Sequence, residues 1–381
     1  MDRDVGDSGL TARWVLIAGG IALAAVALAA VLIAWSGIYS VAASKDHFAI
    51  TARFLEFALR NSVRTHAGDE PQPDLSNGRL ITIGAGHYQG GCAACHGAPG
   101  EPRNPIPLQM LPAPPYLGEK LDWTDDELFW IVRHGIKYAG MPAWVAPERK
   151  DEVWAVVAFL RAFPQLSPEE YRRLSLGEAA AVDAVASAPA FDFGTPAAGP
   201  VAACVRCHGL DGDGRANGAF PRLSLQSPAY IEAALRAYAG GKRASGIMQP
   251  IAAVLDDAAR ARLAAHYGRD RRPSVPPPAG AGAGIGRRIA LEGVPEEGVV
   301  ACESCHGADR AADVPALAGQ YEAFIIDQLR LFRSGARGGE KAVVMKSVAD
   351  RMSEAQIAAV AAWYASLAVT EQPRAQAPAA Q

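Results

Sequence analysis

The six cysteines of this chain all lie in three copies of one short motif, in which two thiols are separated by two residues and a histidine follows directly. The copies are Cys92-Ala-Ala-Cys95-His96, Cys204-Val-Arg-Cys207-His208 and Cys302-Glu-Ser-Cys305-His306. Thiols and imidazoles bind metals, and paired thiols can also form disulfides or attach a cofactor. The repetition indicates one chemistry that is carried out three times along the chain.

Covalent attachment of haem explains this spacing best. Cysteines at positions i and i+3 of a helical turn lie on one face, where both thiols can reach the two vinyl groups of one haem. The next residue, histidine, can then bind the iron. Zinc would need further ligands, and every cysteine is already used. A redox dithiol would lie in an α/β pattern, which is missing, and short disulfides of this type would be strained. We therefore predict three covalently bound haem c groups, with His96, His208 and His306 as iron ligands.

A methionine follows each histidine further along: Met141 after His96, Met248 after His208 and Met345 after His306. An iron that carries electrons usually takes a sixth ligand from the protein, and methionine sulfur is common and raises the reduction potential. The chain has only six methionines, so we predict these three as the second axial ligands. Met352 is an alternative to Met345, and Met110 to Met141, and we interpret both as packing residues.

The three copies lie in three tandem units of similar length, and we expect each unit to be one small domain. The units span residues 79–172, 180–272 and 283–370, and are called units one, two and three. Each closes with an apolar segment of helical period, over 151–163, 256–267 and 353–367, and Asp or Ser at its start is a good N-cap. No segment alternates with period two, so the pattern predicts an all-α fold.

The remaining segments are interpreted as an anchor, linkers and a tail. Residues 14–44 carry no charge, and Trp14 and Trp35 lie roughly 31 Å apart along a helix that rises ~1.5 Å per residue, which matches a bilayer. We predict a retained transmembrane helix within 1–44. A cleaved signal peptide is the alternative, but the apolar run is too long for one. Three further segments complete the division: an amphipathic helix within 45–78, a Pro/Gly linker over 273–282 and a disordered tail over 371–381.

The motifs resemble those of class I cytochromes c. Units two and three, with Phe-Pro-Arg-Leu at 220–223 and Val-Pro-Ala-Leu at 314–317, are similar to tandem two-haem cytochromes, and unit one, with Gly-Met-Pro-Ala-Trp at 140–144, is similar to membrane-anchored monohaem cytochromes of proteobacteria. The resemblance implies that the carbonyls of Pro115, Pro221 and Pro315 accept the Nδ1–H of the ligand histidines. It also implies haem domains in the periplasm, beside the bacterial inner membrane. Unit two departs in lacking a convincing helix before Cys204, which we expect to be reduced or displaced to 177–187.

We expect an electron carrier and not an enzyme, because irons with two protein ligands leave no position for a substrate. The resemblance implies redox proteins as partners: a quinol-oxidising complex or periplasmic dehydrogenase as donor, and a terminal oxidase or soluble carrier as acceptor. A net charge of only −3 gives no indication of nucleic-acid binding, and no small-molecule substrate is expected. The alternatives are a dedicated cytochrome subunit of a membrane-bound sugar, alcohol or aldehyde dehydrogenase, a haem peroxidase or thiol-oxidising enzyme, and a scaffold without haem.

Overall fold

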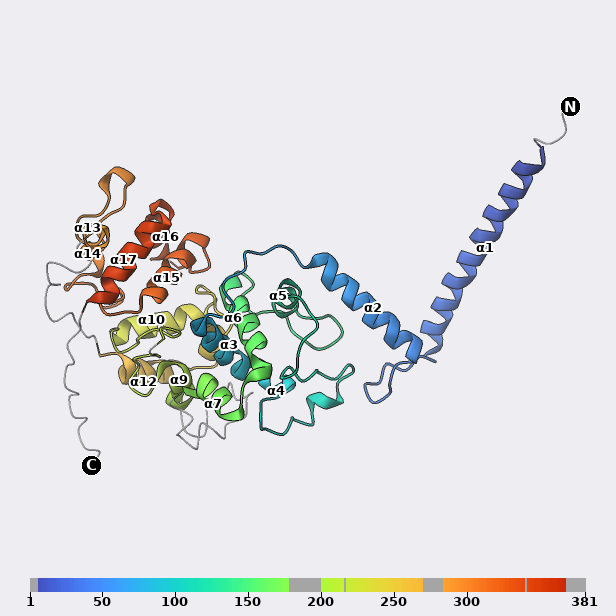
Figure 1. The fold of residues 1–381 in the computed structure, drawn as a ribbon, viewed down its shortest axis with the longest axis horizontal. Helices are drawn as coiled ribbons and strands as arrows, with labels where there is room; N and C mark the ends of the chain where they lie inside the picture. The colour runs from blue at the N-terminus through green and yellow to red at the C-terminus, as the bar shows by residue number, and fades with distance from the viewer. Residues whose placement is uncertain (1–5, 178–199, 216, 270–283, 340, 368–381) are drawn as a thin grey trace.

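The structure is a computed structural model that describes residues 6–177, 200–215, 217–269, 284–339 and 341–367. Helices and loops make up these residues, with three isolated antiparallel bridges and no strand among them. One long N-terminal helix projects from a body that holds the remaining helices (Figure 1). The predicted all-α fold is confirmed.

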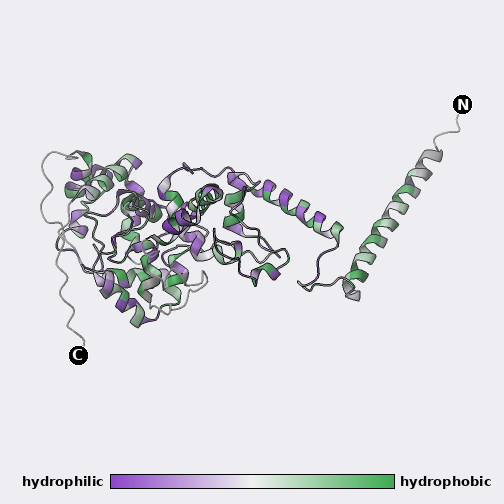
Figure 2. Ribbon diagram, turned by 60° about the horizontal axis from the view of Figure 1, so that its bottom comes forward, coloured by the Kyte–Doolittle hydropathy of each residue, from purple (hydrophilic) through white to green (hydrophobic). Residues whose placement is uncertain are grey.

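Helices α1 (Gly6–Ser36) and α2 (Ala49–His66) connect the N-terminus to the body (Figure 1). Between Ala12 and Ser36, α1 is long and apolar enough to cross a membrane, and the rest of the described chain buries none of its most apolar stretch. Helix α2 is the predicted amphipathic helix, in which apolar and polar residues alternate along the ribbon (Figure 2). Its Val63 is fully buried and its C-terminal part packs against unit one, whereas Phe54 and Phe57 stay exposed.

Unit one is built on the crossing of its first and last main helices, α3 and α6. Its elements are α3 (Gly78–Gly91), α4 (Ala93–His96), η1 (Pro107–Gln109), α5 (Asp125–His134), α6 (Lys150–Ala162), η2 (Phe163–Gln165) and α7 (Pro168–Leu176). Tyr88, Phe159, Phe163 and Tyr171 form the centre of its core, with ring centroids 4.9 to 6.3 Å apart. Aromatic pairs at such separations add to the stability from burial.

Units two and three each have an apolar core of their own. Unit two consists of α9 (Pro200–His208), α10 (Pro228–Ala239), α11 (Met248–Ala253) and α12 (Asp257–Tyr267). Unit three consists of α13 (Ile285–Glu292), η4 (Pro295–Glu297), α14 (Glu303–His306), α15 (Glu322–Ser334), α16 (Ala342–Arg351) and α17 (Glu354–Ser366). The three Cys-x-x-Cys-His pentapeptides therefore pack against three separate cores, one in each unit.

The predicted closing helices are confirmed as α6, α12 and α17, with one correction to their caps. Asp256 and Ser353 cap α12 and α17, each accepting a hydrogen bond from a backbone N–H of the first turn. Asp151 was expected to do the same for α6 and does not, because α6 begins one residue earlier. Its carboxylate instead binds the guanidinium of Arg149. The helix predicted at 177–187, the linker 273–282 and the tail 371–381 lie outside the described residues, apart from Gly177, which follows α7.

Two glycines allow the first and last helices of units one and three to touch. A Cβ on Gly84 of α3 would overlap the Ala155 carbonyl of α6, and a Cβ on Gly286 of α13 would overlap the Ala359 carbonyl of α17. Only hydrogen fits at these crossings, so glycine is required there for close packing and not for an unusual backbone angle.

We expect Gly84→Ala to lower the free energy of unfolding by about 1–3 kcal/mol, because the added methyl must push α3 away from α6. Denaturant unfolding of the purified protein measures this. Gly78→Ala, in the first turn of α3 with open space around it, is the matched control and should leave stability unchanged or slightly raised. Equal effects of the two substitutions would contradict the close-contact explanation.

Candidate haem-binding sites

The paired thiols lie at the edges of the three cores. Cys92, Cys204 and Cys302, the first cysteine of each pair, pack against the cores of units one, two and three. Burial raises the pKa of the Cys92 and Cys204 thiols to about 12 and that of Cys302 to about 11. Thiolates would be rare at neutral pH, so these pairs are poorly suited to thiol–disulfide exchange. They are placed to hold an apolar group against the core.

Each pentapeptide histidine is oriented by a proline carbonyl, as the resemblance implied. The Nδ1 atoms of His96, His208 and His306 lie 2.8, 3.4 and 2.9 Å from the carbonyl oxygens of Pro115, Pro221 and Pro315, respectively. Since a carbonyl can only accept, Nδ1 carries the proton and Nε2 is left for a metal. Burial lowers the pKa of all three imidazoles, that of His208 to about 4. Neutral imidazole is the form that binds iron.

The methionines predicted as ligands are all half-buried. Met248 begins α11 and Met345 lies in α16, and each packs against the same core as the first cysteine of its unit. Met141 instead lies in a tight turn, where its carbonyl accepts a hydrogen bond from the Ile136 N–H at 3.1 Å. In each of units two and three, the first cysteine and the predicted ligand methionine therefore pack against the same core.

The alternatives to these methionines have packing positions. Met352 is 5% exposed within the core of unit three, as expected of a packing residue. Met110 is half-buried, and its methyl group fills the space where a Cβ on Gly140 would lie. It therefore packs on the turn that carries Met141.

Two arginines that the sequence analysis did not single out lie together between units two and three. Arg243 and Arg337 form an antiparallel bridge, and their guanidinium groups donate to the same Gln328 Oε1 at 2.8 and 2.7 Å. Arg337 also donates to the Tyr230 hydroxyl at 2.9 Å. Although burial raises the pKa of Tyr230, the two arginines lower it to about 8 overall. The repeated Gly-x-Arg at 241–243 and 335–337 was the available sequence signal.

The two arginines have no acidic partner in the described chain, and a haem would supply one. Burial, with a further contribution from Arg243, lowers the pKa of Arg337, and no carboxylate of the described chain forms an ion pair with either arginine. Like charges that are buried together are unfavourable unless an anion accompanies them. The propionates of a haem are such anions. Thiol pairs, neutral imidazoles and buried guanidinium groups are thus all consistent with haem, and Arg243 and Arg337 would hold a propionate.

Within the described ranges, no group of three His, Cys, Asp or Glu side chains is placed to hold a metal ion.

Comparison with known proteins finds cytochromes c among the relatives of this chain. Residues 79–160 match the family model for cytochrome c oxidase, cbb3-type, subunit III. The thiosulfate dehydrogenase electron acceptor of Thiomonas intermedia (strain K12) is 38% identical over 171 residues, which are 43% of this chain and 78% of that protein. Cytochrome c4 of Thiocapsa roseopersicina is 33% identical over 191 residues, 48% of this chain and 96% of that protein. The solved cytochrome c4 of Acidithiobacillus ferrooxidans is 37% identical and covers 43% of this chain and 98% of its own, with a TM-score of 0.37.

The sites and the relatives therefore indicate the class of this protein: it binds haem covalently and transfers electrons. The chain belongs to the class I cytochrome c family and has tandem domains like those of dihaem cytochromes c. Its relatives are electron carriers, so the prediction of a carrier that is not an enzyme is confirmed.

We expect Arg337→Gln to lower the free energy of unfolding of the haem-loaded protein by about 1–3 kcal/mol, because a bound propionate would lose a charged hydrogen-bond donor. Thermal or denaturant unfolding measures this. Arg330→Gln, which breaks a surface ion pair between α15 and Glu354 of α17, is the control and should change stability little. A stability gain in Arg337→Gln would mean that relief of repulsion with Arg243 outweighs any anion contact.

Proposed function

We propose that this protein is a membrane-tethered carrier with three haems, one in each unit. The observation that carries the proposal is the threefold recurrence of a thiol pair on an apolar core beside a histidine whose Nδ1 is held by a proline carbonyl. Curated relatives such as cytochrome c4 support haem c as the cofactor.

In this proposal the six cysteines attach the haems, and three pairs of axial ligands complete the coordination of the irons. The pairs are His96 with Met141, His208 with Met248, and His306 with Met345. Each haem, when bound, supplies a one-electron Fe(III)/Fe(II) couple. The proline carbonyls fix the imidazole tautomers, the thioethers favour the reduced state, and the apolar cores exclude water. Water exclusion keeps the environment similar in both oxidation states, which favours rapid electron transfer.

In this proposal the carrier is anchored in the bacterial inner membrane, with its haem units in the periplasm. The apolar helix within Ala12–Ser36 supports the anchor, and the exposed Phe54 and Phe57 of α2 would rest at the membrane surface. Tethering raises the local concentration of the carrier near a membrane-bound partner.

Two curated relatives are named as electron acceptors of thiosulfate dehydrogenase, which favours a periplasmic dehydrogenase as the electron donor of this chain. Electrons would leave to a terminal oxidase or a soluble carrier. A quinol-oxidising complex is the second candidate donor, and a dedicated cytochrome subunit of a sugar, alcohol or aldehyde dehydrogenase is the alternative role. Stable co-purification with a dehydrogenase from native membranes would favour the subunit, and rapid reduction by a dissociable dehydrogenase would favour the carrier.

We expect mature protein to carry three covalent haems and Met248→Ala to lower one reduction potential of three, because one iron loses its thioether. Mass spectrometry counts the haems, and potentiometric titration with near-infrared spectra follows the methionine–iron charge-transfer band. Met352→Ala is the matched control: it should cost about 2–5 kcal/mol of stability through a core cavity while leaving the band intact. A shift of all three potentials in Met248→Ala would refute the assignment of one ligand methionine to each unit.

We expect the full chain to stay in the membrane fraction after a carbonate wash and a variant that starts at residue 45 behind a cleavable secretion signal to be released in soluble form. A continuous apolar helix holds a protein in a bilayer, whereas α2 alone binds the surface weakly and reversibly. Immunoblotting of both fractions measures this. Release of the full chain, with a mature N-terminus near residue 44, would instead indicate a cleaved signal peptide.

A further inference from the structure

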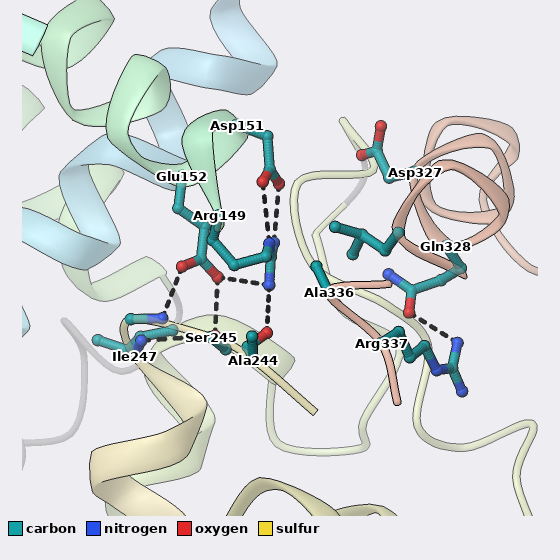
Figure 3. A network of polar contacts seen from close by, with 12 residues as sticks. Arg149, Asp151, Glu152, Ala244, Ser245, Ile247, Asp327, Gln328, Ala336 and Arg337 are labelled. Carbon is teal, nitrogen blue, oxygen red and sulfur yellow. Dashed lines mark hydrogen bonds and ion pairs between the residues drawn. The ribbon is translucent and has the colours of Figure 1, made fainter. Parts of the chain in front are cut away.

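A buried carboxylate of unit one reaches into unit two. Glu152, in the first turn of α6, is only 5% exposed. One of its oxygens accepts a hydrogen bond from the Ser245 hydroxyl at 2.7 Å and the other from the Gly246 N–H at 2.6 Å. Figure 3 shows this carboxylate directed at the segment that precedes α11. Charge-assisted hydrogen bonds of this kind are strong when they are buried.

Ser245 connects this carboxylate to the segment that carries Met248. Its hydroxyl donates to Glu152 and accepts from the N–H groups of Met248 at 3.2 Å and Ile247 at 3.4 Å. A hydroxyl has one donor and two acceptor lone pairs, so these three hydrogen bonds use its full capacity. Ser245 is 3% exposed, so water does not replace these contacts. The first N–H of α11 is thereby fixed through a residue of another unit.

Neighbouring groups hold Glu152 in place. Arg149 pairs with it at 2.8 Å and donates to the Ala244 carbonyl at 2.8 Å (Figure 3). The Trp144 indole occupies the space where a Cβ on Gly246 would lie. Trp144 also follows Met141 closely in the sequence, so the two predicted methionine segments of units one and two lie against each other. The ligand segment of unit two is therefore packed and hydrogen-bonded by unit one.

Units three and one support their methionine segments differently. Met345 lies in a helix of 10 residues, whereas Met248 begins a helix of only 6. The longer helix is held by its own unit: the Arg333 side chain donates to the Ala349 carbonyl at 3.0 Å, and the Arg333 carbonyl accepts from the Lys346 ammonium at 2.8 Å. The Met141 turn is closed by Ile136 of unit one. Because so short a helix is marginal by itself, unit two depends more on outside support.

We propose that Glu152 of unit one is a positioning residue for Met248 of unit two, acting through Ser245. Iron ligation in unit two then depends on the docking of unit one. The proposal rests on the ligand set put forward above.

The test uses the full haem-loaded chain and the variants Glu152→Gln, Ser245→Ala and their combination. In each we expect a loss of up to about one third of the methionine–iron charge-transfer band, since one iron of three is affected. One reduction potential should fall, and added imidazole should bind one haem more readily. The double variant should lose no more than the larger single loss, because both changes break the same connection.

Asp125→Asn is the matched control. It breaks an ion pair with Arg161 at 2.6 Å that lies entirely within unit one, so a general weakening of that unit would appear here as well, and the band should stay intact. An unchanged band and unchanged potentials in both Glu152→Gln and Ser245→Ala would overturn the proposal. If Glu152→Gln fails to fold, Ser245→Ala, which removes only a hydroxyl, decides the outcome. Met248→Ala separates the two hypotheses: an intact band in that variant would overturn the ligand assignment itself.

Discussion

The hydrogen bond between a histidine Nδ1 and a proline carbonyl is the contact on which each unit depends. It fixes the neutral tautomer and leaves Nε2 available to bind a metal. The thiol pair and the imidazole are adjacent in sequence, so one helical turn places them together, but the carbonyl comes from a separate loop. The helices around each core have to bring that loop to the imidazole. Glycines such as Gly84 and Gly286 make this possible by allowing the first and last helices to touch.

Buried polar contacts join the three units. Arg149 and Glu152 bind unit two, and Arg243 reaches Gln328 of unit three. Buried polar groups are costly unless every partner is in place, so such contacts favour one relative arrangement of the units over others that apolar packing alone would tolerate. A fixed arrangement matters for a carrier with several redox centres, because electron transfer between centres falls steeply with distance.

Residues 79–160, in unit one, match the family model and follow an apolar helix, and units two and three each add an apolar core of their own. That first unit lies directly on the second: a Cβ on Gly86 of α3 would lie 3.7 Å from the Cys207 sulfur.

The sequence by itself determined the features that depend on local spacing. The pentapeptides, the closing helices and α2 follow from motifs and from helical periodicity, which a single segment contains in full. The pairing of Asp151 with Arg149, the juxtaposition of Arg243 with Arg337, and the connection from Glu152 through Ser245 to Met248 were decided only by the tertiary structure. Each joins side chains whose proximity depends on where a helix begins or on how two units dock. No local pattern encodes those outcomes, because they result from the packing of many residues at once.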